Sequence, residues 1–471
     1  MDLNRMRMKI VLMLSVPIAS SLFAQVIVLL INSAMVGHLG VAALAGVGVA
    51  GEIYTVFSAI LFGIDAGVQA LVARRSGEGK LHLAGDILTD AIATSVLLGA
   101  VLATIAFAAG PMMLAMILHN ADAVEQGKPY LLVAAPALLF VGANYAFNAY
   151  WNGSGVPKFT LLVTVIQLPL SVLFSYVLMF GPFGLPALGT AGLALGSMLA
   201  TLIALAANVL LATRIRPVPL LMKKPPSLSG MGAVLNIGLP ISLEQSTLHL
   251  GTATFFVIVG ILGAHQVAVV NVLIGLDHLA ILPAIGIGIA TATVVGASLG
   301  GKDVAGARQW GWEGGAVGTL VVLPVSLLIL LFPGTILHLF IHDDAVAALG
   351  VWPARFLALS MCVNTFGRIV GFGLRGSGAT KTISIVNTGM NWLVQLPMAW
   401  LVGVGLGYGL FGIALSRFVL LAVEAAIIVA LWRRGDWAKV KVPPAVEADV
   451  STSGGLVAAV EVAQAPGAAG N

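Results

Sequence analysis

Five carboxylate side chains interrupt long apolar stretches of this sequence. An ionised side chain at the centre of a bilayer costs about 2.5–3.5 kcal/mol on insertion scales, so such a position usually serves a function or has a partner. A carboxylate shielded from water can bind a proton, a metal cation or an organic ammonium group. The five candidates are Glu52, Asp65, Glu244, Asp277 and Glu424. Basic or titratable side chains lie in comparable stretches at Arg368, Arg417, His249 and His278.

Glu244 lies one helical turn after a proline. Pro240 weakens the local helix ladder and frees a backbone carbonyl, and a carboxylate four residues later can complete a cation site. His249 is a titratable neighbour in the same stretch. The alternative is a structural salt bridge between Glu244 and Arg368. Of the two interpretations we favour the cation site.

Two of the carboxylates share one predicted span, 43–73. Glu52 and Asp65 are about 20 Å apart along a helix, so they cannot hold a single ion together. Asp65 lies deeper, where a charge costs more to desolvate, and we favour it slightly over Glu52. Asp277 is followed by His278, and a carboxylate with an imidazole can shuttle a proton. Adjacent helical residues point about 100° apart, however, so a structural role for Asp277 stays open.

Amides and one charged pair supply the remaining polar groups. Gln25 and Asn32 are seven residues apart on one helix face, where they can face a cavity or hydrogen-bond to a neighbouring helix. Arg417 and Glu424 have the same spacing in the last apolar stretch. We interpret these two as a structural ion pair, within one helix or between lobes.

The composition places these groups in a membrane. The chain is 59% hydrophobic and only 9% charged, with a mean hydropathy of +1.04, whereas a soluble domain is about 25% charged. Apolar runs of at least about 18 residues recur along the chain, which indicates a polytopic α-helical protein rather than a β-barrel. We predict twelve spans, at residues 10–36, 43–73, 86–110, 130–151, 159–181, 189–213, 233–261, 266–297, 311–333, 352–374, 382–404 and 409–432.

Several functions are excluded by what the sequence lacks. No G-x-x-x-x-G-K-[ST] motif occurs, so the chain does not encode ATP hydrolysis, and we expect no enzyme activity and no bound cofactor. Cys362 is the single cysteine and lies in a predicted span. A disulfide within the chain and a cysteine metal cluster are therefore excluded.

A shift of 223 residues places the first half of the chain on the second without a gap over about 140 residues. Each copy carries six spans, so both enter the membrane from the same side, and a pseudo-twofold axis runs along the membrane normal. We therefore predict an N-terminal lobe at 1–213, a cytoplasmic linker at 214–232, a C-terminal lobe at 233–435 and a disordered cytoplasmic tail at 436–471. The matched pairs include Pro17 with Pro240, Gly63 with Gly286, Gly77 with Gly300, Gly155 with Gly378 and Lys158 with Lys381.

Basic residues define the orientation of the spans. Of the 23 Lys and Arg residues, all but four fall in segments on one side of the predicted membrane. The positive-inside rule then places both termini in the cytoplasm, and we expect a multi-pass protein of the inner membrane. The four exceptions are Lys128, Arg355, Arg368 and Arg417.

A series of motifs resembles the multidrug and toxic compound extrusion (MATE) family. In that family a proline precedes an aspartate and then MVGxLG, and here Pro17 is followed by MVGHLG ending at Gly40. Further landmarks follow in family order, and the resemblance covers about residues 10–435. They are LVARRSG (71–77), GLPISLEQ (238–245), GAHQ (263–266) and GFGLRGSGAT (371–380).

The resemblance implies two six-helix lobes around a V-shaped cavity and export of bulky, often cationic organic compounds. It also implies coupling to inward movement of Na⁺ or H⁺, with small organic molecules as substrates. Two positions depart from the family pattern: Asn32 stands where the family has its first-span aspartate, and Asn364 where some bacterial members have an acid. Asparagine can help to ligate Na⁺ but cannot carry a proton, so the choice between Na⁺ and H⁺ stays open.

Two other functions are open to a polytopic membrane protein with an internal repeat. A lipid-linked precursor flippase of the same superfamily would carry extra spans and a strongly cationic cavity, whereas only Arg368 and Arg417 are predicted within spans. A non-transporting scaffold or receptor would not need five carboxylates in the membrane. We therefore expect a monomeric cation-coupled antiporter that works by alternating access.

Overall fold

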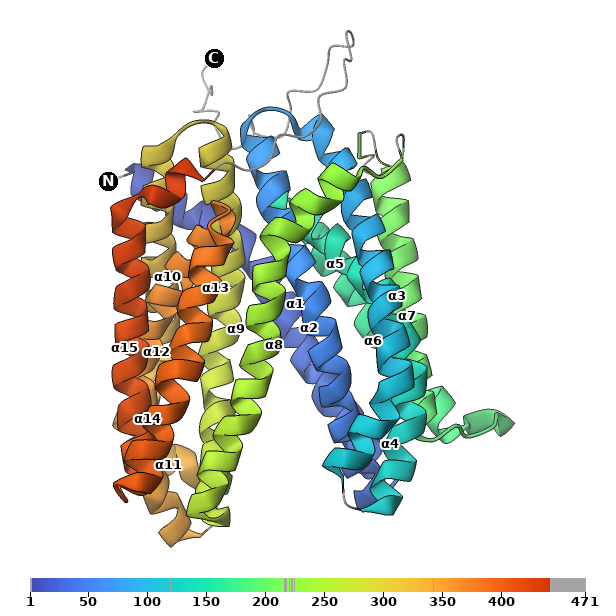
Figure 1. The fold of residues 1–471 in the computed structure, drawn as a ribbon, viewed down its shortest axis with the longest axis vertical. Coiled ribbons are helices and arrows are strands. Elements are labelled where there is room, and N and C mark those ends of the chain that lie inside the picture. The colour runs from blue at the N-terminus through green and yellow to red at the C-terminus, as the bar shows by residue number, and fades with distance from the viewer. Residues whose placement is uncertain are drawn as a thin grey trace, which may run out of the picture.

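In the computed structural model, every regular element of the described residues is helical (Figure 1). The structure describes residues 2–118, 120–215, 218, 219, 221, 223, 225–341 and 343–440, without the side chains of residues 2–5, 183 and 264. The main helices are α1 (Asp2–Gly37), α2 (Val41–Gly77), α3 (Ala84–Ile117), α4 (Ala121–Ala134), α5 (Leu138–Gly153), α6 (Lys158–Phe180), α7 (Thr190–Leu210), α8 (Leu228–Leu262), α9 (Ala264–Gly300), α10 (Val304–Leu331), α11 (Pro333–His338), α12 (Asp344–Gly376), α13 (Thr380–Gly389), α14 (Leu396–Trp400) and α15 (Gly409–Arg434).

The twelve predicted spans are all present as helices. Eleven are continuous helical segments long and apolar enough to cross a membrane, with α4 and α5 forming one of them. The twelfth, at 380–405, consists of α13 and α14 joined and followed by π-helical turns at Met390–Gln395 and Leu401–Gly405. Helices α10 and α12 begin earlier than the apolar pattern predicts, at Val304 and Asp344, where the side chains of Asp303 and Asp343 cap them.

Two lobes pack side by side, α1–α7 in one and α8–α15 in the other (Figure 1). Their backbones repeat the same turns. Gly40 and Gly263 have φ of 111° and 125°, and Gly155 and Gly378 have φ of 76° and 90°. Only glycine adopts this region readily, so the matched glycines of the two copies mark conformations that a side chain would strain. The structure thereby confirms the internal repeat.

Helices α2 and α9 meet across the pseudo-twofold axis. A Cβ on Gly77 would collide with the backbone of Ala297, and one on Gly300 would collide with the backbone of Arg74. The 223-residue shift converts each of these contacts into the other. Bare glycines at both positions let the two backbones touch at the end of the bundle that holds Gly77 and Gly300, which we call the basic end because Arg74, Arg75, Lys302 and Arg308 are also there.

A second symmetric pair of contacts lies further along the same helices. Gly63 of α2 packs on Ser242 of α8, and Gly286 of α9 packs on Ala19 of α1. Ser242 also donates a hydrogen bond to the carbonyl of Ile60 at 2.6 Å. The lobes are therefore joined by four helices that cross over in pairs, α2 with α8 and α1 with α9.

The interlobe hydrogen bonds of Gln69 and Thr293 lie in the half of the bundle toward the basic end. Gln69 of α2 donates to the carbonyl of Ile289 at 2.8 Å and to the hydroxyl of Thr293 at 2.9 Å, and Thr293 donates to the carbonyl of Asn152 at 3.1 Å. Toward the opposite end, where α4 and α11 lie, the ribbons of the two lobes diverge (Figure 1).

Helical segments are present within the residues predicted as linker and as tail. Helix α8 begins at Leu228, inside the predicted linker, and Ser227 caps it by accepting from the N–H of Gly230 at 3.0 Å. After α15, residues 436–439 form a helical turn in which Trp437 is buried and stacks on Trp432 with ring centroids 4.0 Å apart. The large apolar ring of Trp437 is buried beside α15, which holds residues 436–439 in a defined turn. The rest of the predicted tail, 441–471, lies outside the described residues.

Candidate functional site

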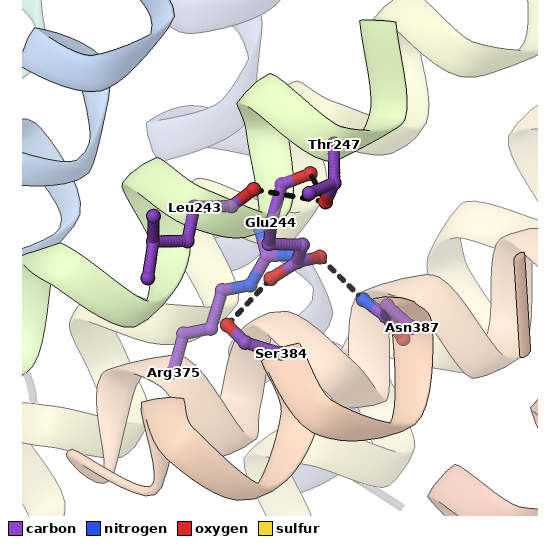
Figure 2. Close-up of polar contacts among 6 residues, drawn as sticks. All are labelled: Leu243, Glu244, Thr247, Arg375, Ser384 and Asn387. Carbon is purple, nitrogen blue, oxygen red and sulfur yellow. Dashed lines mark hydrogen bonds and ion pairs between the residues drawn. The ribbon is translucent and has the colours of Figure 1, made fainter. Parts of the chain in front are cut away.

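Glu244 is held by three hydrogen-bond donors inside the C-terminal lobe (Figure 2). The guanidinium of Arg375 donates to Oε1 at 2.6 Å, the amide of Asn387 donates to the same oxygen at 2.6 Å, and the hydroxyl of Ser384 donates to Oε2 at 2.7 Å. The Glu244 side chain is only 7% exposed and that of Arg375 is 13% exposed. We call these four residues the Glu244 cluster.

The salt bridge given above as the alternative for Glu244 does form, but with a different arginine. Glu244 pairs with Arg375 rather than with Arg368, because Arg375 in the last turn of α12 extends its side chain back along the bundle toward α8. Its guanidinium also lies 4.9 Å from the centre of the Phe372 ring. The positive-inside rule places Arg375 in a cytoplasmic segment, at the end of the predicted span 352–374. The signal it missed is the pair Ser384 and Asn387, whose i,i+3 spacing puts two donors on one face of α13.

The cluster lies beside a π-helical turn. Residues Met390–Gln395 face α8, where Trp392 donates to the carbonyl of Thr247 at 3.1 Å. Gly251 of α8 leaves room for the side chain of Asn391. Turns of this kind often occur at functional sites, because they shift the register of side chains on one helix face.

Asp65 is buried in the N-terminal lobe without a counter-charge among the described residues. The residue is 7% exposed, and its Oδ1 atom has no hydrogen-bond partner. It lies on the stripe of α2 that includes Leu61 and Val72, which contact Gly142 and Gly153 of α5. Asp65 therefore points into the N-terminal lobe, about 200° around the helix from Gly63, which contacts α8.

Other side-chain oxygens of the N-terminal lobe share this property. Buried oxygens without a hydrogen-bond partner occur on Asn32, Asp65, Ser95 and Asn148 of this lobe, and also on Glu313, Asn387 and Asn391 of the C-terminal lobe. Buried polar atoms are nearly always paired in folded proteins, so each exception calls for an explanation. Hard cations such as Na⁺ prefer oxygen ligands. The N-terminal lobe thus carries acceptors that a cation can satisfy.

Asp277 and Arg417 form a loose ion pair in the half of the C-terminal lobe that lies away from the basic end. Their closest atoms, Oδ2 and Nη2, are 4.0 Å apart. The predicted pair of Arg417 with Glu424 was wrong, because the ion-pair partner of Arg417 is Asp277 on the neighbouring helix α9. His278, next to Asp277, is exposed and its Nδ1 lies 2.8 Å from the carbonyl of Ile274, so it does not join the pair.

The remaining predicted residues do not join these groups. Glu52 and Gln25 are exposed, whereas Asn364, Arg368 and His249 are half-buried and make no hydrogen bond or ion pair with a side chain among the described residues. Asp65 and Glu244 lie on opposite sides of the contact between Gly63 and Ser242. The structure therefore distributes the predicted ion-binding residues over three places rather than one.

An ion pair that the sequence did not reveal links the lobes at the basic end. Arg7 of α1 lies 3.8 Å from Glu313 of α10, and its guanidinium is 5.2 Å from the centre of the Trp310 ring. Gln309 donates to Glu313 at 2.8 Å. Glu313 lies at the edge of the predicted span 311–333, so the apolar pattern does not single it out.

Comparison with known proteins gives a consistent result. The MatE family pattern matches residues 17–177 and 240–401, so the two matched segments begin at the proline pair related by the 223-residue shift. The chain is 23% identical over 414 residues to a probable multidrug resistance protein NorM of Thermotoga maritima, covering 87% of this chain and 88% of the relative. It is 27% identical over 433 residues to the multidrug resistance protein NorM of Burkholderia vietnamiensis, covering 89% and 92%.

Solved structures share the fold. A MATE transporter crystallised in a bent conformation superposes with a TM-score of 0.85 at 21% identity, covering 93% of this chain and 98% of that chain. A MOP superfamily transporter from Pyrococcus furiosus, described as having a binding pocket of reverse polarity, gives a TM-score of 0.83 at 20% identity, with 92% and 97% covered.

Proposed function

The chain belongs to the MatE family of membrane transporters, and from this premise we propose that it exports organic compounds in exchange for an inward-moving cation. Relatives named for multidrug resistance support a broad substrate range. The observation that carries the coupling is Asp65, a buried carboxylate with one oxygen unpartnered. The cation is Na⁺ or H⁺, and Asp65 binds it.

The argument for Asp65 is one of charge balance. An ionised carboxylate in a buried site is strongly destabilised unless a counter-charge compensates it. No basic side chain within 4.0 Å supplies one to Asp65 among the described residues, so a bound cation completes the site. Substrate binding that removes the cation, or the reverse, then exchanges one charge for another and links the two movements.

Glu244 is a weaker candidate for the coupling residue, for the opposite reason. Arg375 already supplies its counter-charge, and Ser384 and Asn387 satisfy the remaining acceptor sites. A cation can reach this carboxylate only after the guanidinium withdraws. We assign the Glu244 cluster to holding α8, α12 and α13 together, and coupling to Asp65.

Alternating access follows from where the lobes touch. The described interlobe contacts gather toward the basic end, which the positive-inside rule assigns to the cytoplasm together with both termini. We therefore assign this arrangement to the state closed toward the cytoplasm. Opening toward the cytoplasm requires the glycine contacts of Gly77 and Gly300 to separate, and the matched crossovers, α2 with α8 and α1 with α9, provide a symmetric hinge.

The test is coupled transport by purified protein in proteoliposomes. Ethidium, a planar organic cation, is followed by fluorescence while an inward gradient of Na⁺ or of protons is imposed. Asp65→Asn should reduce gradient-driven movement at least about tenfold, as expected when about 1.4 kcal/mol or more of coupling is lost. Glu52→Gln, an exposed carboxylate on the same helix, is the matched control and should transport normally. Wild-type coupling by Asp65→Asn would refute the assignment.

A further inference from the structure

At the basic end, the first helix of each lobe meets an acidic side chain on the third helix of the other lobe. Glu313 of α10 faces Arg7 of α1, with Oε1 and Nη1 3.8 Å apart. Asp90 of α3 accepts hydrogen bonds from the backbone N–H and the hydroxyl of Ser227, at the start of α8. The 223-residue shift places Asp90 on Glu313. It also places Arg7 on Gly230, where a Cβ would collide with the Asp90 carboxylate. The two contacts are therefore counterparts in the internal repeat.

The two counterparts differ in how firmly they hold. The hydrogen bonds that Asp90 accepts are 2.6 and 3.2 Å long, and both come from the N-cap residue of α8. The contact between Arg7 and Glu313 is longer than a hydrogen bond. Oε2 of Glu313 and Nη1 of Arg7 are buried and have no hydrogen-bond partner among the described residues. Such atoms gain hydrogen bonds when they reach water, so Glu313 and Arg7 separate at a lower cost than Asp90 and Ser227.

The start of α1 is inserted into the C-terminal lobe. Arg7 and Val11 lie one turn apart on the same face of α1. Val11 is fully buried in a cluster that includes Ile287 of α9 and Val317 of α10. The Arg7 guanidinium also lies 5.2 Å from the centre of the Trp310 ring. Separation of the lobes at the basic end must therefore withdraw this turn of α1 from the other lobe.

From these observations we propose that Arg7 and Glu313 form a releasable latch, so that the basic end opens between α1 and α10 while Asp90 keeps the start of α8 anchored. This inference rests on the proposed function, because it specifies which of two matched contacts separates during alternating access. Glu313 is a positioning residue: its charge holds Arg7 in the closed state, and water satisfies both groups in the open state. The hinge between the lobes is symmetric, whereas the latch is not.

The experiment measures how fast a buried reporter cysteine reacts with a membrane-impermeant maleimide. The protein is the full chain in nanodiscs, with Cys362 replaced by serine. One reporter is Val11→Cys in α1, and the other is Val234→Cys at the matched position of α8; the two valines are 0% and 1% exposed. Glu313→Gln leaves Arg7 buried without its counter-charge, which destabilises the closed state. We expect it to speed labelling of Val11→Cys at least about tenfold, equivalent to about 1.4 kcal/mol in the opening equilibrium. Labelling of Val234→Cys should stay unchanged.

Two further variants separate the charge interaction from a general loss of packing. The charge reversal Arg7→Glu with Glu313→Arg restores an ion pair, so it should slow labelling of Val11→Cys again. Asp90→Asn is the matched control, because it neutralises the counterpart acid but keeps an acceptor oxygen for the N–H of Ser227. It should change the labelling of neither reporter.

The two reporters make the outcome decisive. An unchanged rate at Val11→Cys in Glu313→Gln would overturn the inference, and so would an equal rise at Val11→Cys and Val234→Cys, which is the result of general loosening. Labelling as fast in the charge reversal as in Glu313→Gln would also overturn it. Labelling needs no gradient and no ethidium, so normal transport by Asp65→Asn would refute the proposed coupling without changing this result. An unresponsive Val11→Cys reporter would likewise leave coupling at Asp65 standing.

Discussion

Replacing Glu244 by glutamine should destabilise the C-terminal lobe more than any other single polar substitution discussed above. The variant leaves Arg375 buried at 13% exposure without its carboxylate. Breaking a buried, hydrogen-bonded ion pair from one side costs about 3–5 kcal/mol, because the remaining charge is uncompensated. For a lobe of this size such a loss lowers the unfolding midpoint by on the order of 10 °C.

A double-mutant cycle separates the pair from the rest of the cluster. Glu244→Gln with Arg375→Gln removes both charges, so it should recover more than half of the lost stability. Ser384→Ala removes one donor while the carboxylate keeps its ion pair, and it should cost about 1.5–3 kcal/mol, less than Glu244→Gln. The assay is thermal unfolding of the purified protein, followed by tryptophan fluorescence and by recovery of monodisperse protein after heating.

Transport by the double variant tests what the cluster is for. If Glu244 only holds three helices together, the double variant should regain transport along with stability. A double variant that is as stable as the wild type but transports nothing would refute the structural role and return Glu244 to the coupling mechanism. If Glu244→Gln unfolds at the same temperature as the wild type, the hydrogen-bonded ion pair of the Glu244 cluster is refuted.

Two further predictions concern the connections between the lobes. Gly77→Val and its counterpart Gly300→Val should each weaken the closed basic end, which is measured as faster labelling of a cysteine introduced at Ala297 or Arg74. Gly48→Val is the control on α2, because its added side chain meets open space, and it should not change the labelling rate. An unchanged labelling rate in both Gly77→Val and Gly300→Val would contradict the symmetric contact. Asp90 accepts hydrogen bonds from the backbone N–H of Ser227 at 2.6 Å and from the Ser227 hydroxyl at 3.2 Å. Loss of this acceptor costs about 1–3 kcal/mol, so protease should cleave the start of α8 about tenfold faster in Asp90→Ala. Equal cleavage of Asp90→Ala and the wild type would show that the anchor is dispensable.

The sequence predicted the two-lobe helical fold well, because that fold depends on residues with strong local conformational preferences. Pro17 and Pro240, together with turn glycines such as Gly155 and Gly378, mark backbone geometry that few other residues adopt. Long apolar runs then fixed the spans. The predicted two-lobe repeat and its twelve helices are confirmed, since neither depends on which side chains touch.

Pairing between charged residues was predicted poorly, and the reason is geometric. Arg417 and Glu424 are seven residues apart, which places them on one helix face but about 10 Å apart along the axis, beyond the length of a direct ion pair. Asp277, on a different helix, is nearer. Arg375 reached Glu244 for a related reason, because a long side chain at a helix end can fold back several ångströms into the protein. The spacing of Ser384 and Asn387 marks a helix face with two donors, but one sequence does not show which charged residue meets that face.

Competition between substrate and cation at Asp65 is the central claim, and equilibrium binding tests it most directly. Ethidium affinity is measured on nanodisc-embedded protein across a series of Na⁺ concentrations at fixed pH, and across pH without Na⁺. Competition predicts that ethidium affinity of the wild type falls as one of the two cations is raised, and that Asp65→Asn binds ethidium with an affinity independent of both. An affinity in Asp65→Asn that still falls with the same cation as in the wild type would contradict the account.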